Sequence, residues 1–386
     1  MVKPIAYVTR LQAEYRRPIL ENLNDRLNGR LIVFAGAHSD SSLKHFSYVR
    51  TPKYKCVELT NRWGFGQKAL FQNFGPVISC NPSVILAEES PRSVSLPLLL
   101  ASAKLKKIRT LLWGHFSSNT RPFSANNLFD RYRIWLAKSV DGCVCYTDEI
   151  SDLIQPYLSE KSCFIARNTL DTNSLFSLRD SLDLEGKTNV RIRLGLPPHG
   201  KTVVFIGRLI AEKHPEHLLE LHKTLSAKEH ASLVIIGDGP ERTKLMNRVD
   251  QESLSNVFFL GALSRFEDSA PWIFSSDVMV CPGYVGLNIN HAFCLGLPVV
   301  TYSSPDPNIR FHSPEIAYLQ PGINGMMADY CNTTSLLDCT LNVLENHHHF
   351  SSNALSYAQS HLSTEQMVDG LEQSINYVES LYDHNS

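Results

Sequence analysis

The chain has 386 residues, of which 43% are hydrophobic and 19% charged, and its formal net charge is −1 at pH 7. This length is too great for one ordinary domain and suits two, and the composition excludes a disordered chain. No run of about 18 consecutive apolar residues occurs, so we expect the chain not to cross a membrane.

The small net charge hides two halves of opposite sign. Residues 1–161 contain 22 Lys and Arg against 13 Asp and Glu, and residues 162–386 contain 15 against 25. A basic half indicates an anionic partner, and without a nucleic-acid motif an anionic membrane surface or a phosphate-bearing acceptor fits better than nucleic acid. The alternative is that these charged residues lie on ordinary solvent-exposed faces and bind no partner.

The chain start and the cysteines both favour a cytoplasmic protein. The N-terminus resembles a β-strand, Ile5–Thr9, rather than a signal peptide, so we expect no secretion. Nine cysteines occur, and none forms the paired CxxC pattern of a zinc site. We therefore expect reduced thiols.

Short β-branched runs alternate with helical patterns, which is typical of βαβ units and a parallel sheet. The first half contains predicted strands at 5–9, 31–35, 84–87, 110–113 and 143–146. This rhythm predicts a doubly wound N-terminal domain over residues 1–165.

The alternation of strand and helix patterns begins again after a polar, turn-rich stretch, which we interpret as a linker over residues 166–200. Further strands are predicted at 203–206, 233–236, 257–260, 278–281 and 299–302. They predict a second domain over residues 201–362. The apolar stripe of residues 364–381 predicts a terminal helix, which we assign to the first domain with the rest of 363–386.

The most informative residues directly follow the first strand of the second domain. Gly207 allows a ligand to approach the backbone closely. The planar guanidinium of Arg208 offers paired N–H donors for phosphate oxygens, and the flexible side chain of Lys213 offers a positive charge. Because ligands of open α/β sheets bind at the carboxyl ends of strands, this group can clamp a diphosphate. A surface turn with incidental charges is the alternative.

Three more segments follow in order, each at the end of a predicted strand. They are LVIIGDGPER from residue 233, FFLGAL from residue 258, and PGYVGLNINHAFCLGLPVV from residue 282. Together with Gly207, Arg208 and Lys213, they resemble glycosyltransferase family 4. Three short segments of the first half are similar, in the same order, to the corresponding motifs of bacterial surface-polysaccharide members of this family. They are residues 112–115, 146–147 and 168–171. The resemblance implies an α/β GT-B fold, in which two Rossmann-like domains face a cleft that holds the active site.

The resemblance also implies roles for individual residues. The catalytic set is His115, Arg208 and Lys213. The glycine pair of the first βα loop is absent here and Arg10 stands in that loop, so we expect Arg10, with Glu89, on the acceptor side. The donor-binding set is Gly207, Gly237, Leu263, Gly283, Tyr284, Val285, Gly286, Leu287 and His291. A helix beginning near Leu287 would direct backbone N–H groups at the β-phosphate. A structural role for His115 is the alternative.

Two departures from the family pattern stand out. Members usually carry two glutamates whose positions fall here on Gly283 and His291. We hypothesise that Gly283 leaves room for a bulkier donor sugar and that His291 replaces the ribose contact. The two cations make a metal unnecessary, so we expect no metal and no cofactor beyond the nucleotide-sugar.

Two basic segments with aromatic or apolar residues, 104–109 and 131–138, fit an anionic bilayer surface. We therefore expect peripheral association with the inner face of the cell membrane, the alternative being that Trp135 and Leu136 are core.

The sequence predicts a retaining hexosyltransferase of surface polysaccharide biosynthesis, such as lipopolysaccharide O-antigen or capsule. Its acceptor would be a saccharide or a lipid-diphosphate-linked saccharide, without nucleic acid. A nucleotide-sugar 2-epimerase and a non-catalytic nucleotide-sugar-binding relative are the alternatives.

Overall fold

The computed structural model describes residues 2–36, 52–118, 121–158, 162–309 and 311–382. They form two compact units. Unit 1 comprises residues 1–118, 122–171 and 364–386, and unit 2 comprises residues 119–121 and 172–363.

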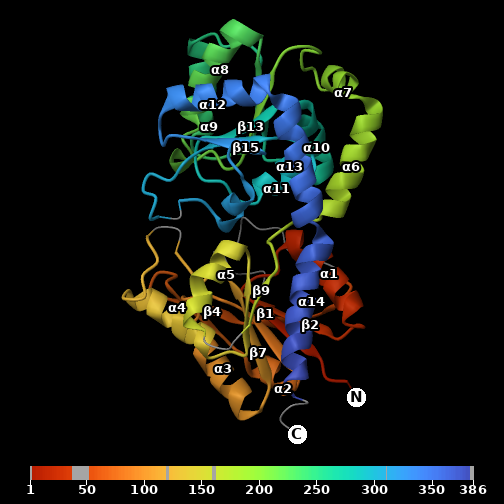
Figure 1. Cartoon of the computed structure of the whole chain (residues 1–386), viewed down its shortest axis with the longest axis vertical. Helices are drawn as coiled ribbons and strands as arrows, with labels where there is room; N and C mark the ends of the chain where they lie inside the picture. The colour runs from red at the N-terminus through yellow and green to blue at the C-terminus, as the bar shows by residue number, and fades with distance from the viewer. Residues whose placement is uncertain (1, 37–51, 119–120, 159–161, 310, 383–386) are drawn as a thin grey trace. The chain divides into compact units, whose positions relative to one another are not determined.

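Unit 1 is a parallel sheet of order β3-β2-β1-β6-β7-β8-β9 with helices on both faces (Figure 1). Its elements are β1 (Ile5–Thr9), η1 (Glu14–Arg16), α1 (Arg17–Arg26), β2 (Leu31–Gly36), β3 (Lys55–Leu59), β4 (Asn61–Gly64), β5 (Ala69–Gln72), α2 (Gly75–Ser79), β6 (Val84–Glu88), α3 (Leu96–Leu105), β7 (Arg109–Gly114), α4 (Leu128–Lys138), β8 (Gly142–Cys145), α5 (Asp148–Ile154), η3 (Gln155–Tyr157), β9 (Ser162–Ile165) and α14 (Thr364–Ser380). The strand order reverses between β1 and β6, where ligands of such sheets bind.

Unit 2 is a second parallel sheet, of order β12-β11-β10-β13-β14-β15. Its elements are α6 (Thr172–Glu185), α7 (Lys187–Arg193), β10 (Thr202–Ile206), η4 (Ala211–Lys213), α8 (Glu216–Glu229), β11 (Ser232–Ile236), α9 (Arg242–Gln251), β12 (Val257–Gly261), α10 (Phe266–Ser275), β13 (Val278–Cys281), α11 (Asn288–Cys294), β14 (Val299–Tyr302), η5 (Pro314–Tyr318), β15 (Gly325–Ala328), α12 (Thr333–Glu345) and α13 (His347–His361). Here the order reverses between β10 and β13.

The predicted α/β class and all ten predicted strands are confirmed, with boundaries that differ by at most one residue. Strands β3, β9 and β15 and the antiparallel hairpin of β4 and β5 were not predicted. Most of these strands are short, and β3 is largely exposed at the sheet edge, so they lack the long apolar run that marks a central strand.

The segment 166–200, interpreted from sequence as a linker, contains the two helices α6 and α7. Both pack on α10 of unit 2, and α7 is fixed by Arg191, which donates to Asp277 at 2.7 Å and to the Ser275 carbonyl at 2.9 Å. The terminal helix α14 packs on α1 and on the strands β7 to β9 of unit 1.

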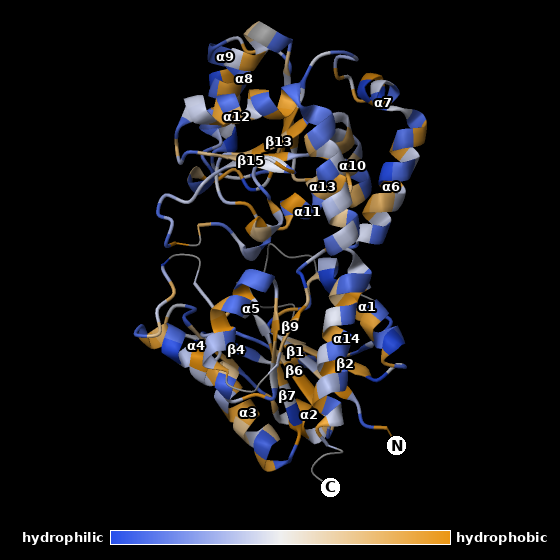
Figure 2. Cartoon of the chain, in the orientation of Figure 1, coloured by the Kyte–Doolittle hydropathy of each residue, from blue (hydrophilic) through white to orange (hydrophobic). Residues whose placement is uncertain are grey.

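The central strands are buried on both faces and apolar throughout, as a sheet covered by helices requires. Figure 2 shows this apolar interior within each unit. The nine cysteines are all free. Among the described helices, none has both the length and the apolar character needed to cross a bilayer.

Candidate functional site

The predicted donor residues gather at the carboxyl edge of the unit 2 sheet. Gly207 and Arg208 directly follow β10, and residues 282–287 directly follow β13, which is the strand beside β10. Lys213 ends η4, the short helix that follows Arg208 along the chain. The reversal of strand order between β10 and β13 therefore places these residues where a parallel sheet binds its ligand.

Arg208 and Lys213 both contact Tyr284. The exposed Arg208 donates from Nη2 to the Tyr284 hydroxyl at 3.2 Å. The Lys213 side chain is buried, and its Nζ donates to the Tyr284 carbonyl at 3.0 Å and lies 4.2 Å from the ring centroid. The structure thus brings together both predicted cations and one predicted donor residue.

Gly237 joins the same edge through its backbone. The Gly207 N–H donates to the Ile236 carbonyl at 2.9 Å, and a Cβ atom at Gly237 would overlap the Gly207 carbonyl oxygen. The two loops can approach this closely only because residue 237 has no side chain. Gly237 therefore has a packing role at this edge, and its donor-binding role stays a prediction.

Gly283 does not leave an open space for a sugar, which corrects the hypothesis drawn from its sequence. A Cβ atom at this position would overlap the Cα of Lys213 and lie 2.8 Å from the Glu212 carbonyl oxygen. Backbone atoms cannot move aside as a flexible side chain can. Gly283 instead allows the loop after β13 to pack directly on the segment that carries Lys213.

Two of the four N–H groups of residues 285–288 are already bonded within unit 2. The Val285 N–H donates to Nδ1 of His312 at 2.9 Å, and the Gly286 N–H donates to Oδ1 of Asn288 at 3.0 Å. Among the described residues, no partner accepts from the N–H groups of Leu287 and Asn288, at the start of α11. These two groups are the available backbone donors for an anion.

His312 is a residue of this edge that the sequence analysis missed. It is 4% exposed, and its Nε2 donates to the Tyr302 carbonyl at 2.9 Å while Nδ1 accepts from Val285. Burial lowers its pKa to about 4, helped by the nearby Lys213 charge and opposed by the bond to Tyr302. His312 is therefore a neutral clamp between the loop after β13 and the end of β14.

His291 lies on α11, and its ring packs edge-on against Phe266 with centroids 4.9 Å apart. Burial lowers the pKa of His291 to about 4, so the imidazole is uncharged at neutral pH. Leu263 is half-buried in the loop between β12 and α10, which also leads to Phe266. Leu263 follows β12, which is separated from β13 by two strands, whereas Tyr284 follows β13 itself.

Unit 1 has a pocket of about 300 Å³ at the carboxyl edge of its own sheet. Three sequence-predicted residues line it together, namely Arg10 after β1, Glu89 after β6 and His115 after β7. The strand order reverses between β1 and β6, so this pocket also lies at the ligand position of its sheet.

Arg16, which the sequence analysis missed, lies buried in the wall of this pocket. It donates to the hydroxyls of Tyr7 and Tyr146 at 2.8 and 2.7 Å and to the Glu88 carboxylate at 3.0 Å, and its guanidinium lies 4.5 Å from the Trp113 ring. Burial alone lowers the pKa of Arg16, but the surrounding hydroxyls and the carboxylate raise it overall. A fixed positive charge therefore stands behind the pocket.

The two carboxylates of the pocket differ in environment. The Glu89 side chain is 2% exposed and lies 3.3 Å from Nε of Arg133, and burial raises its pKa against the opposing Arg133 charge. A Cβ atom at Gly114 would overlap the Glu89 side chain, so this glycine allows it to pack there. The Glu88 side chain is 26% exposed, which makes it the more accessible of the two.

His115 and Arg10 are the side chains best placed to meet a ligand in this pocket. The His115 ring packs edge-on against Tyr146 with centroids 4.5 Å apart. The Arg10 backbone N–H donates to Glu88 at 3.3 Å, and within the described part of the chain no side chain or carbonyl accepts from its guanidinium. Arg10 can therefore bind an anion without giving up an internal ion pair.

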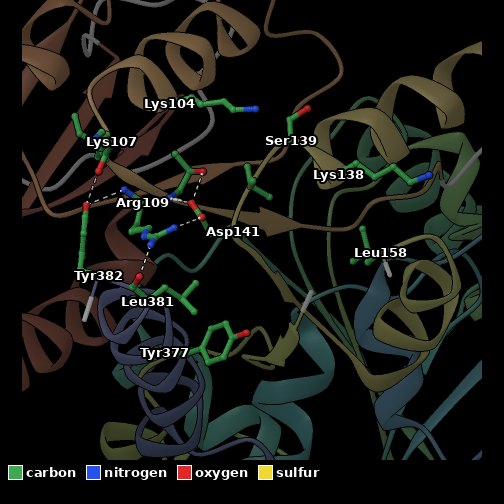
Figure 3. A pocket seen from close by; sticks show the side chains of 13 residues that line it. Lys104, Lys107, Arg109, Lys138, Ser139, Asp141, Leu158, Tyr377, Leu381 and Tyr382 are labelled. Carbon is green, nitrogen blue, oxygen red and sulfur yellow. Dashed lines mark hydrogen bonds and ion pairs between the residues drawn. The ribbon is translucent and has the colours of Figure 1, made fainter. Parts of the chain in front are cut away.

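A larger cavity of about 1050 Å³ lies at the opposite, amino edge of the unit 1 sheet. Lys104, Lys107 and Lys138 line it from α3, the turn after α3, and α4, as Figure 3 shows. Arg109 is held there by Asp141 at 3.0 Å and packs on the Tyr382 ring at 5.0 Å. The cavity is thus predominantly cationic.

Comparison with known proteins finds a family match within unit 2. Residues 200–346 match the family model described as glycosyl transferases group 1. The matched segment contains all the predicted donor residues and both predicted cations.

Curated relatives match over about a third of the chain. A GDP-mannose-dependent alpha-mannosyltransferase of Corynebacterium glutamicum is 35% identical over 147 residues, which are 37% of this chain and 32% of the relative. A D-inositol 3-phosphate glycosyltransferase of Thermomonospora curvata is 29% identical over 141 residues, 33% of this chain and 32% of the relative. The matches span about a third of each relative's length.

Solved structures match over nearly the whole chain. Anabaena Alr3699/HepE, solved with UDP, has a TM-score of 0.67 at 15% identity and covers 97% of this chain and 100% of its own. A glycosyltransferase from Rickettsia africae has a TM-score of 0.69 at 14% identity, with 98% of both chains covered. At these identities the likeness shows the fold, and it confirms the GT-B prediction.

Proposed function

We propose that this chain, whose residues 200–346 match the glycosyl transferases group 1 family model, is a retaining glycosyltransferase that uses a nucleotide-diphosphate sugar. The observation that carries the proposal is the convergence of Arg208 and Lys213 on Tyr284 at the carboxyl edge of the matched domain. A buried lysine and an exposed arginine at one point suit a ligand that carries two adjacent phosphates.

Stabilisation of negative charge at this edge would account for most of the rate acceleration of the transfer reaction. As the sugar–oxygen bond breaks, negative charge grows on the leaving diphosphate, and Arg208, Lys213 and the N–H groups of Leu287 and Asn288 can stabilise it. The acceptor hydroxyl attacks on the face that the diphosphate vacates, and the leaving phosphate takes its proton. This scheme needs neither a metal nor a separate base, and it keeps the anomeric configuration.

GDP-mannose is the first donor to test, because two curated relatives of this chain are GDP-mannose-dependent alpha-mannosyltransferases. UDP-sugars are the second choice, since Anabaena Alr3699/HepE was solved with UDP-glucose. The neutral His291 can donate or accept one hydrogen bond to a donor sugar or ribose.

The unit 1 pocket is the proposed acceptor site, with Arg10, His115 and Glu88 as the contacting side chains. The fixed charge of Arg16 and the guanidinium of Arg10 favour an acceptor that carries phosphate, such as a lipid-diphosphate-linked saccharide. A lipopolysaccharide outer core galactosyltransferase, WaaB, shares the fold with a TM-score of 0.62 at 11% identity. Surface polysaccharide synthesis on the cytoplasmic side is therefore the proposed setting.

A transfer assay tests the function. The purified chain is incubated with GDP-mannose or a UDP-sugar, with and without bacterial lipid-linked saccharides, and nucleoside diphosphate release is measured. We expect release that depends on both donor and acceptor and that falls at least 100-fold in Lys213→Met, as for loss of a group that stabilises transition-state charge. Absence of release with every donor contradicts the proposal, and acceptor-independent release with epimerised sugar indicates a 2-epimerase.

We also propose that α3 and α4 dock unit 1 on an anionic membrane surface. Leu128 and Trp135 of α4 are 74% and 50% exposed, and on α3 Leu98 and Leu105 are 69% and 87% exposed. Trp135 is thus not a core residue, whereas Leu136 is fully buried. Exposed apolar residues with the cations of the adjacent cavity form the mixed face that interfacial helices use.

Vesicle co-sedimentation tests this docking. We expect the chain to bind vesicles that contain phosphatidylglycerol more strongly than vesicles of phosphatidylcholine alone, and Leu105→Glu to weaken that binding severalfold by adding charge to the apolar face. Leu184→Glu is the matched control, because Leu184 is 91% exposed on α6 of unit 2. Equal effects of the two substitutions would show that this face has no special role.

A further inference from the structure

A group of three metal-ligating side chains lies where η4 leads into α8. His214, Glu216 and His217 each offer a ligand atom, and these atoms all lie within 4.8 Å of one another. Nδ1 of His214 is 3.7 Å from the Glu216 carboxylate, and the two imidazole rings stack with centroids 5.3 Å apart. Nothing in the proposed transfer reaction uses these three side chains.

Each histidine has one ring nitrogen near a partner from another element. Nε2 of His214 lies 3.4 Å from the Tyr330 hydroxyl and 3.6 Å from Sγ of Cys331, while Nδ1 of His217 lies 3.0 Å from the Tyr302 hydroxyl. Metal-ligating histidines have this arrangement, in which an outer partner fixes the ring and its tautomer while the other nitrogen binds the ion. The remaining nitrogens are Nδ1 of His214 and Nε2 of His217.

Two residues of this cluster have a left-handed backbone conformation. His214, the C-cap residue of η4, has a φ of 45°, and Cys331 has a φ of 53°. The conformation of His214 ends η4 and lets the chain turn into α8, which carries Glu216 and His217.

The chemistry of the group selects one class of ion. Two imidazoles and a carboxylate are the ligands of open zinc sites, whereas Mg²⁺ and Ca²⁺ prefer oxygen ligands alone. We infer that His214, Glu216 and His217 bind a Zn²⁺-type ion, with a fourth position for water.

The ion would link segments of unit 2 that lie far apart in sequence. Its ligands belong to the η4–α8 junction, and the outer partners Tyr302 and Tyr330 belong to the end of β14 and the segment after β15. His214 directly follows Lys213, so the ion would also restrain the segment that carries the proposed phosphate-binding lysine. The inference itself rests on the ligand cluster and not on the proposed function.

Zinc binding to the full chain tests the site without any activity measurement. Metal-free protein is titrated with Zn²⁺ in competition with a chromophoric chelator. We expect one tight ion per chain, roughly tenfold or more weaker binding in Glu216→Gln and His217→Ala, and weaker binding in Tyr302→Phe, which lacks an outer partner. His348→Ala is the matched control, since His348 is an exposed histidine outside the cluster and should leave binding unchanged.

Thermal unfolding and Co²⁺ spectra complete the test. Zn²⁺ should raise the Tm of the wild type and of His348→Ala but not of Glu216→Gln, whose metal-free Tm should equal that of the wild type because it keeps the side-chain shape. Co²⁺ should give a tetrahedral spectrum without a thiolate band. The inference is overturned if Glu216→Gln binds as the wild type does, if replacing His347, His348 and His349 together abolishes binding, or if a thiolate band shows that Cys331 is a ligand.

Discussion

At the scale of single residues, Gly283 shows how a missing side chain can be a structural requirement. From sequence it was interpreted as space for a donor sugar, in place of a glutamate of the family pattern. In the structure the same position is filled by the backbone of Glu212 and Lys213. The loop after β13 and the segment of Lys213 therefore hold each other in place through backbone contact.

This packing gives a direct prediction for Gly283→Ala. The new methyl group must push the Lys213 backbone away, and overpacking of this kind costs about 1–3 kcal/mol. We expect a Tm lower by several degrees, measured by calorimetry, together with weaker binding of nucleoside diphosphates.

Gly286→Ala is the matched control in the same loop. Its Cβ would meet the Ser313 side chain at 3.4 Å, which is ordinary van der Waals contact, so the Tm should be nearly unchanged. A Gly283→Ala variant as stable as Gly286→Ala would contradict the packing described for Gly283.

Several residues of the two sites were predictable because each follows a strand that the sequence indicates clearly. Arg208, Lys213, Arg10 and His115 belong to this group. Arg16 was not predictable, since its partners Glu88 and Tyr146 are 72 and 130 residues away in sequence and meet it only in the folded sheet. His312 was missed although its partners Val285 and Tyr302 are only 27 and 10 residues away, because no sequence motif marks the contacts of its ring.

At the scale of elements, the loop between β13 and α11 is held by one neutral histidine. His312 accepts from the Val285 N–H and donates to the Tyr302 carbonyl, so both ring nitrogens are used. A second proton on Nδ1 would face the Val285 N–H and break that bond. The folded loop is therefore compatible only with the neutral imidazole.

A pH-dependent stability follows. The folded pKa of His312 is about 4 and lies below the ordinary value of 6.5 in the unfolded chain. Between pH 6.5 and 4 the unfolded chain takes up a proton that the folded chain does not, so the free energy of unfolding falls as the pH falls. The titration of His312 alone should lower the free energy of unfolding by about 3 kcal/mol at pH 4.

Urea denaturation at several pH values measures this loss. His312→Gln is the informative variant, because a glutamine amide can accept from Val285 and donate to Tyr302 but does not titrate. His291 also has a pKa lowered to about 4, so the difference between wild type and variant isolates His312. Parallel pH profiles for the two proteins would show that His312 is not the titrating group.

Strands were predictable where every position is buried, because the sequence there is apolar throughout. Strands such as β11 and β13 are buried at every position and appear as continuous apolar runs. Helices α6 and α7 were not expected because their outward faces are polar and they directly follow a turn-rich stretch. Their place is fixed by tertiary contacts such as that of Arg191 with Asp277, which the sequence pattern does not reveal.

At the scale of the whole molecule, the two units differ in charge and in the ligand chemistry that they offer. Unit 1 carries most of the excess Lys and Arg, a cationic cavity and a pocket backed by Arg16. Unit 2 is acidic in composition, yet it places Arg208 and Lys213 at one edge of its sheet. A local pair of cations in an acidic unit is a specific feature, since net charge alone would repel an anionic ligand.

The most direct test of the account is nucleotide binding to unit 2, measured by isothermal titration calorimetry on the full chain. Wild type is titrated with GDP, UDP and GDP-mannose, and compared with Arg208→Ala and with Lys223→Ala, a cation on α8 that pairs with Glu252 at the C-terminal end of α9. We expect at least one nucleotide to bind wild type and Lys223→Ala equally, and Arg208→Ala to bind it about tenfold or more weakly, as for loss of one charge-assisted phosphate contact. Binding that survives Arg208→Ala unchanged, or no binding of any nucleotide, would contradict the phosphate site and the transfer mechanism built on it.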